Sequence, residues 1–251
     1  MANFTWFYRL ASPPTSYAAA GRLWLWFAVP AVLLIAVGLY GGLVSAPADY
    51  QQGDAFRIIY VHAPSAWLSL LGYSVLGVSA GIGLIWRMKL AHALAAAVAP
   101  IGASFTFLCL VTGSLWGRPM WGAYWAWDAR LTSELILLFM YLGYLALRSS
   151  FDDVSRADRA SAVLALVGLV NVPIIHFSVN WWNSLHQGST VLRVGGPAMP
   201  ASMLVPLLES FLGFTLLFAA LSCVRLRAEI LMRERRPTWL QDGLTVSASH
   251  E

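Results

Sequence analysis

The sequence predicts an all-α integral membrane protein of about six transmembrane helices, with both termini cytoplasmic. Hydrophobic residues make up 59% of the 251 positions and charged residues only 11%, whereas soluble domains carry about 25% charge. Six apolar stretches each approach the ~20 residues that cross a bilayer core. Lysine and arginine are unevenly shared between alternate connecting segments. Because lipid offers no water to backbone groups, each span should be helical.

The predicted spans follow these apolar stretches. The first resembles a signal peptide, since Arg9 and Arg22 precede it. The small residues of Val44-Ser45-Ala46 also look like a cleavage site. The apolar run is longer than the roughly 7–15-residue core of a signal, and Pro47 follows this site, so we expect a retained helix. The fourth is the shortest. The predicted spans cover residues 23–44, 64–86, 93–115, 131–147, 162–179 and 203–224.

The distribution of positive charge predicts the orientation, because cytoplasmic loops carry an excess of lysine and arginine. With the N-terminus inside, the outer segments hold Arg57, Arg118, Arg130 and Arg193, and the rest of the 16 basic residues lie inside. Both termini are therefore predicted to be cytoplasmic. The inner basic residues are Arg9, Arg22, Arg87, Lys89, Arg148, Arg156, Arg159, Arg225, Arg227, Arg233, Arg235 and Arg236.

We expect one membrane domain over residues 1–236, with a disordered cytoplasmic tail at 237–251. The basic run 225–236 should continue the last helix and anchor at anionic lipid. The pI of 9.3 comes without a basic stripe, so nucleic-acid binding is not expected. Cys109 and Cys223 lie in apolar runs and are predicted to be packing residues. The sequence has no phosphate-binding Gly-Lys-Ser/Thr signature, so any ATP hydrolysis would belong to a partner.

Half of the twelve tryptophans fall in two outer segments, 116–130 and 180–188. An aromatic belt explains a few tryptophans at each interface, but poorly explains four within twelve residues beside Tyr124. If the second half of segment 116–130 is helical, Trp121, Trp125 and Asp128 share one face. The result would be an apolar shelf suited to a porphyrin. The cations expected to meet its propionates are Arg118, Arg130 and Arg57.

Two histidines are predicted to reach this shelf. His62 stands just before Pro64, at the outer start of the second span, and His186 follows the fifth span. Imidazole is a common ligand of haem iron. A single histidine at a helix end is more often an ordinary interfacial residue, but two beside the shelf favour haem. His176 is expected to be buried within the fifth span.

The run Trp121-Gly122-x-Tyr124-Trp125-x-Trp127-Asp128-x-Arg130-Leu131-Thr132 resembles the WWD signature of membrane haem-handling proteins. The length, the six-span layout, the flanking His62 and His186, and the segment 181–186 resemble one branch of that superfamily closely. This branch is the cytochrome c maturation protein C family (CcmC, haem exporter protein C). The resemblance covers nearly the whole chain, up to about Pro237.

The resemblance implies that haem b is bound at the periplasmic face of the bacterial inner membrane, with His62 and His186 as axial ligands. It implies transfer to the haem chaperone CcmE, together with the ABC-type subunits CcmA and CcmB and the small membrane protein CcmD. We expect a haem-presenting subunit with lyase-like action rather than a conventional enzyme. The predicted haem-binding set is His62, His186, Trp121, Tyr124, Trp125, Trp127, Asp128, Arg130 and Arg118.

Other classes of protein remain as alternatives. A structural membrane subunit or small-molecule permease could use the tryptophan loop only as an interfacial anchor, without haem, although a permease should show matching pairs of broken helices. An electron carrier should place its histidines within the spans. Two carboxyl groups have structural explanations: Glu134 as a partner of Arg130 and Glu209 in packing. Asp128 either caps the fourth span or contacts haem.

Overall fold

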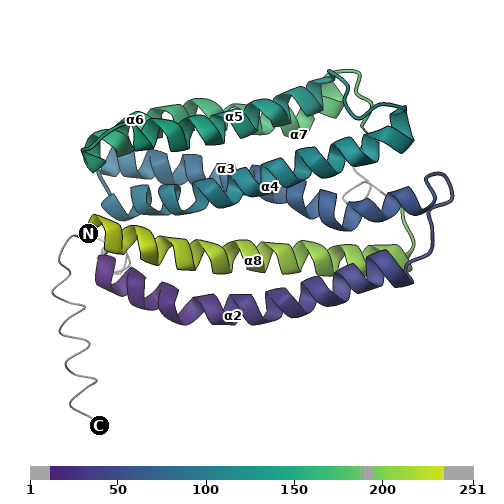
Figure 1. Ribbon diagram of the computed structural model, residues 1–251, viewed down its shortest axis with the longest axis horizontal. Helices are drawn as coiled ribbons and strands as arrows, with labels where there is room; N and C mark the ends of the chain where they lie inside the picture. The colour runs from purple at the N-terminus through teal and green to yellow at the C-terminus, as the bar shows by residue number, and fades with distance from the viewer. Residues whose placement is uncertain (1–11, 187, 189–190, 192–194, 235–251) are drawn as a thin grey trace, which may run out of the picture.

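The computed structural model describes residues 12–186, 188, 191 and 195–234, and it confirms the all-α class (Figure 1). In that part of the chain the only β-pairing is an isolated bridge between Asp49 and Gly53. Six segments are long and apolar enough to cross a membrane, as predicted. They are Pro13–Ser45, Asp54–Trp86, Lys89–Trp121, Ala129–Ser149, Val154–Trp181 and Ala201–Arg233.

These segments consist of α-helices with short stretches of other helical type beside two of them. The elements are α2 (Pro13–Tyr40), the π-helix η1 (Gly41–Ser45), the 3₁₀-helix η2 (Asp54–Ile58), α3 (Ile59–Trp86), α4 (Lys89–Trp121), α5 (Ala129–Ser149), α6 (Val154–Leu169), α7 (Asn171–Trp181) and α8 (Ala201–Arg233). The predicted tail 237–251 lies outside the described residues.

Helices α3 and α4 form the centre of the bundle, between α5, α6 and α7 on one side and α8 on the other (Figure 1). Helix α2 packs mainly on α8. The apolar core lies along α3, α4 and α5, where Leu68, Val98 and Leu137 are inaccessible to solvent. Close approach is needed at Gly102, because a Cβ there would lie 2.1 Å from the Tyr141 hydroxyl. That hydroxyl crosses from α5 to donate a hydrogen bond to the Ser69 carbonyl of α3 at 2.9 Å.

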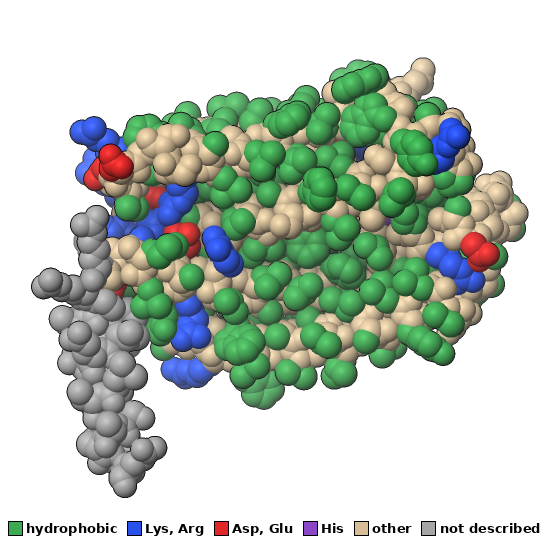
Figure 2. All heavy atoms as spheres, viewed as in Figure 1, with side chains coloured by type: hydrophobic (Ala, Val, Ile, Leu, Met, Phe, Trp, Pro, Cys, Tyr) green, Lys and Arg blue, Asp and Glu red, His purple; other side chains and the backbone are tan. Residues whose placement is uncertain are grey.

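Charged side chains gather at the two ends of the bundle, with an apolar flank between them (Figure 2). We call one end the tryptophan end; it comprises the end of α4, residues 122–128, the start of α5 and the end of α7. The other is the ion-pair end, where the described chain both starts, in α2, and finishes, in α8 (Figure 1). This arrangement agrees with the predicted charge asymmetry, while the orientation in a membrane stays a prediction.

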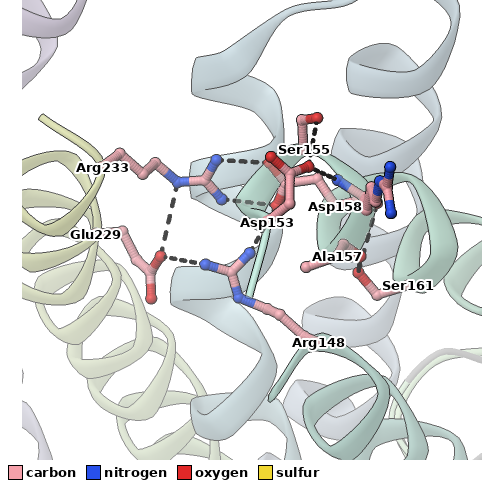
Figure 3. Close-up of polar contacts among 9 residues, drawn as sticks. Arg148, Asp153, Ser155, Ala157, Asp158, Ser161, Glu229 and Arg233 are labelled. Atoms are coloured by element: carbon pink, nitrogen blue, oxygen red, sulfur yellow. Dashed lines mark hydrogen bonds and ion pairs between the residues drawn. The ribbon is translucent and has the colours of Figure 1, made fainter. Parts of the chain in front are cut away.

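A buried ion-pair cluster joins three helices at the ion-pair end (Figure 3). Arg148 of α5 contacts Asp158 of α6 at 2.6 Å and Glu229 of α8 at 2.8 Å. Arg233 of α8 reaches both oxygens of Asp158, at 2.7 and 2.9 Å. Two cations and two carboxylates thus neutralise each other where they are largely removed from water, which is the condition under which buried charges are tolerated.

Proline divides one of the predicted spans and leaves three others continuous. The fifth span is divided at Val170 into α6 and α7, because Pro173 has no N–H to donate to the carbonyl four residues earlier. Helices α2, α4 and α8 continue through Pro30, Pro100 and Pro206. The bundle therefore lacks the matching pairs of broken helices expected of a permease, within the residues described.

Candidate functional site

His62 lies inside α3 rather than before its start, since η2 and α3 begin ahead of Pro64. Its Nδ1 atom is 3.1 Å from the Cys109 carbonyl and 3.0 Å from the Thr112 hydroxyl, both on α4. Thr112 donates its own proton to the Leu108 carbonyl at 2.6 Å, so it can only accept from the imidazole. The proton therefore lies on Nδ1. Nε2 keeps its lone pair and has no hydrogen-bond partner among the described residues.

Trp116 holds the other side of the His62 ring. The two rings meet edge to face, with centroids 5.6 Å apart, and Trp116 also packs against Phe56 at 5.9 Å. The indole N–H donates to the Gln52 side chain at 2.9 Å. Below the imidazole, a Cβ on Gly113 would lie 3.0 Å from His62 Cε1. The imidazole is thus fixed by α4 and by the segment that precedes α3.

Asp128 positions the second histidine. One of its oxygens accepts the Leu131 N–H at 2.8 Å and caps α5. The other accepts the Ser184 hydroxyl at 2.7 Å and the Leu185 N–H at 3.2 Å, and lies 3.4 Å from His186 Nδ1. Asp128 therefore both caps a helix and binds the segment after α7, so the first of the two predicted roles is confirmed.

The charges around His186 favour a neutral imidazole beside an ionised carboxylate. Burial, together with the Arg130 guanidinium, lowers the pKa of His186 below its usual 6.5, although Asp128 opposes this change. Burial also opposes ionisation of Asp128, but the hydrogen bonds from Leu131 and Ser184 outweigh it and hold the pKa of the carboxyl below its usual 3.8. Like His62, His186 has no hydrogen-bond partner at Nε2 among the residues that the structure describes.

The second half of segment 116–130 is not helical up to Asp128, so the condition for a shared helical face is not met. Helix α4 ends at Trp121, where Gly122 adopts φ 76° as its C-cap, and α5 begins only at Ala129. The backbone conformation at Gly122 is one that side-chain-bearing residues rarely adopt, so the helix stops there. Trp121, Trp125 and Asp128 consequently do not share a helical face. Trp121 packs against the His186 ring instead, with centroids 5.1 Å apart.

Trp125 and Trp127 lie on the apolar flank beside this pair. Their rings meet edge to face at 5.4 Å, and both line an open groove of about 430 Å³ between α4 and α5. The Trp125 indole nitrogen is buried without a partner among the described residues, whereas Trp127 is 78% exposed. The remaining groove residues are Phe107, Leu110, Leu135 and Leu138.

The three arginines that were expected to meet the propionates have different surroundings in the structure. Arg118 donates to the Gly122 carbonyl and lies over the exposed Tyr124 ring at 5.6 Å, so it holds the turn after α4. Arg57 is occupied by Asp54 at 2.9 Å and by the Gly42 carbonyl at 3.0 Å. Arg130 forms no ion pair with a described carboxylate, and its charge interacts with both site histidines. Arg130 is thus the cation best placed for an anionic ligand.

Sequence reasoning missed two residues that hold His62 in place, Cys109 and Thr112 on α4, and it missed the contact of His62 with Trp116 on the same helix. The sequence does indicate that Cys109 and Thr112 lie on one face of a helix, because they are about one helical turn apart. Nothing in the sequence shows that this face meets His62. Two other expectations need correction: His176 is exposed on α7 rather than buried, and Glu134 forms no ion pair with Arg130 but lies buried.

The arrangement of the two imidazoles fits a metal ion that is already coordinated by a planar ligand. Ligating imidazoles usually have the other ring nitrogen held by a carbonyl or a carboxylate, which is what Cys109 and Asp128 provide. No group of three histidine, cysteine or acidic residues that could bind a metal ion occurs among the described residues. Two imidazoles leave the other positions of the metal to its own ligand, as a porphyrin does.

Comparisons with known proteins show the family of the chain. The family described as Heme exporter protein C matches residues 6–241. Heme exporter protein C of Escherichia coli K12 is 51% identical over 94% of this chain and 95% of the relative. That of Bradyrhizobium diazoefficiens is 51% identical, over 96% and 92%. A putative cytochrome c biosynthesis ccmC-like mitochondrial protein of Arabidopsis thaliana is 42% identical, over 80% and 75%.

Proposed function

This chain belongs to the haem exporter protein C family, and we propose that it holds haem b at the periplasmic face of the bacterial inner membrane for delivery during cytochrome c maturation. One observation carries the proposal. His62 and His186 each have Nδ1 held, by a carbonyl and by a carboxylate respectively, and each presents a free Nε2. These two nitrogens would be the axial ligands of the haem iron.

The surroundings support a porphyrin between the two rings. Trp116 packs on His62 and Trp121 on His186, so each proposed ligand has an aromatic neighbour that can cover part of a flat apolar ring. Arg130, which interacts electrostatically with both histidines, would bind a propionate. Arg118 would act indirectly, by holding the turn at Gly122.

Transfer to a partner requires that the bound haem remain accessible. Tyr124 and Trp127, in the loop between α4 and α5, are 58% and 78% exposed, and we call these two side chains the rim. We propose that the haem chaperone CcmE docks on this rim while the two histidines present the haem. With no ATPase motif in this chain, the ABC-type subunits CcmA and CcmB would provide ATP hydrolysis, and CcmD would bind within the membrane.

Absorption spectra test the haem site. The protein would be purified in mild detergent from haem-replete cells, oxidised and reduced, beside the variants His62→Ala and His186→Ala. His176→Ala is the matched control, because His176 is exposed on α7. We expect a low-spin bis-histidine spectrum that both site variants lose and the control keeps. A wild-type protein that stays colourless with added haem would contradict the proposal and leave an anchor or permease.

A second experiment tests presentation. Trp127→Ala removes an exposed side chain of the rim, so haem should still bind while the amount of covalent haem–CcmE adduct falls several-fold. Trp26→Ala is a control, because Trp26 is exposed on the distant helix α2 with the same 78% exposure. Unchanged adduct in the Trp127 variant would contradict docking at the rim.

A further inference from the structure

Glu134 is a buried carboxyl that the proposed haem site does not use. It lies in the second turn of α5 and is 6% exposed. Its Oε1 atom is inaccessible to solvent and has no hydrogen-bond partner among the described residues. A carboxyl inside a membrane span is costly to bury, which makes it a candidate for a functional role.

Cys109 connects this carboxyl to the site. The Cys109 thiol and the Ser69 hydroxyl lie beside Glu134, but Ser69 directs its proton to the Ala66 carbonyl at 2.8 Å. The main-chain carbonyl of the same cysteine is 3.1 Å from His62 Nδ1. Glu134 and His62 therefore both contact Cys109 of α4, Glu134 through the thiol and His62 through the main-chain carbonyl.

Few other groups can compensate charge at this position. Those that interact with Glu134 are Arg130 and Tyr141 on its own helix and Cys109 on α4, besides the neutral Ser69 of α3. No charged or titratable group of α6, α7 or α8 interacts with it, within the residues described. Arg130 interacts with Glu134 on one side and with both histidines on the other.

Asp128 differs from Glu134 in the hydrogen bonds that its carboxylate accepts. Its oxygens accept hydrogen bonds from Leu131, Ser184 and Leu185 in addition to facing His186, and such bonds stabilise the charged form. Asp128 therefore stays ionised whatever the iron does. Glu134 has an oxygen without any such bond, so its proton occupancy can respond to a nearby change of charge.

Building on the proposed haem site, we propose that Glu134 exchanges a proton with the medium when the bound iron changes oxidation state. With ferric iron the carboxyl is ionised, and its negative charge offsets the extra positive charge of the iron. When an external one-electron reductant converts the iron to the ferrous state, one proton from the medium binds the carboxylate. One electron and one proton enter together, so the net charge of the buried region does not change.

Redox titration of the haem-loaded protein at a series of pH values tests this role. In the wild type the midpoint potential should fall as pH rises, with a slope up to about 59 mV per tenfold change in proton concentration for one proton per electron. In Glu134→Gln the potential should not depend on pH. At high pH it should exceed the wild-type value, because a neutral amide does not stabilise ferric iron. Glu209→Gln, which neutralises another intramembrane carboxyl, on α8, should keep the wild-type slope.

Infrared spectroscopy provides a second readout. The reduced-minus-oxidised difference spectrum of the wild type should gain the carbonyl band of a protonated carboxyl, and Glu134→Gln should lack it. An unchanged pH slope in Glu134→Gln, or no such band in the wild type, would overturn the proposal. If that variant does not assemble, the wild-type infrared spectrum and Glu134→Asp, which should keep a pH dependence, decide it. Wild-type protein without haem would instead contradict the proposed function.

Discussion

Asp128 and His186 are 58 residues apart in the sequence, yet Asp128 Oδ2 lies 3.4 Å from His186 Nδ1. The same carboxylate caps α5 through Leu131. The start of a membrane-spanning helix and the orientation of a proposed iron ligand therefore depend on one side chain. This connection explains why an aspartate is suited to the end of the tryptophan segment: it supplies a helix cap, an acceptor for Nδ1–H and a permanent negative charge.

Replacing Asp128 should separate these roles. Asparagine caps a helix as well as aspartate does, so Asp128→Asn should keep the stability of α5 while haem affinity falls roughly tenfold, as for other residues that orient a ligand. Asp128→Ala should lose the cap as well and cost about 1 kcal/mol of stability. Haem titration and thermal unfolding in detergent measure the two effects. Equal haem affinity in Asp128→Asn and the wild type would show that the carboxylate does not orient His186.

Haem affinity should depend on pH in a defined direction. Protons compete with iron for Nε2 of His186, and because burial and Arg130 lower the pKa of this imidazole below 6.5, the neutral form predominates at and above that pH. In Glu134→Gln, which lacks the proposed redox-linked carboxyl, affinity should be constant from alkaline pH down to about 6.5 and fall mainly at lower pH. Equilibrium titration with haem across this range measures the dependence. If haem affinity falls to half of its maximum at or above pH 6.5, this would contradict a lowered pKa of His186.

The ion-pair cluster should matter for stability and not for haem binding. Asp158→Asn leaves Arg148 and Arg233 with only Glu229 to neutralise them, and breaking a buried pair in this way costs about 3 kcal/mol. The midpoint of thermal unfolding should fall clearly, while the haem spectrum of the folded variant stays unchanged. Asp152→Asn, at an exposed position before α6, is the control. Equal stability of the two variants would show that the ion-pair cluster does not stabilise the fold.

Gly113 should control the position of His62. The Cβ in Gly113→Ala would lie 3.0 Å from His62 Cε1 and would shift the ring by a few tenths of an ångström, so haem affinity should fall roughly threefold, since binding groups need accurate placement. In Gly143→Ala the Cβ meets Leu164 at 3.3 Å, away from the site. Haem titration of both variants is the comparison. Equal affinities would mean that the imidazole adjusts freely.

Much of the fold could be predicted from the sequence, because a membrane span is a local property. Every span needs a long apolar run, so all six segments were correctly located, and the break at Val170 could be attributed to Pro173 once seen. The ends of the spans were less accurate. Helix α3 begins ahead of Pro64 although this proline stands in its second turn and has no N–H to donate to the Tyr60 carbonyl. Apolar composition does not show where a helix begins or ends.

The site could be predicted only at the level of residue types. His62, His186 and the tryptophan segment carry a recognisable pattern, but the contacts of Nδ1 with Cys109 and Asp128 join residues that are far apart in the sequence. Gly122 shows the same limit at short range. A glycine at this position is compatible with a continued helix or with a turn. In the structure it forms a turn, which separates Trp121 from Trp125. Sequence spacing pairs Glu134 with Arg130 one turn away, and it cannot show that the Glu134 side chain is buried beside α4.

The most direct test of the central claim is an experimental structure of the haem-loaded protein. We predict the iron between Nε2 of His62 and Nε2 of His186, with both Nδ1 atoms still on the Cys109 carbonyl and the Asp128 carboxylate. Haem lying in the groove of Trp125 and Trp127 with both imidazoles free, or iron bound through any other residue, would contradict the account.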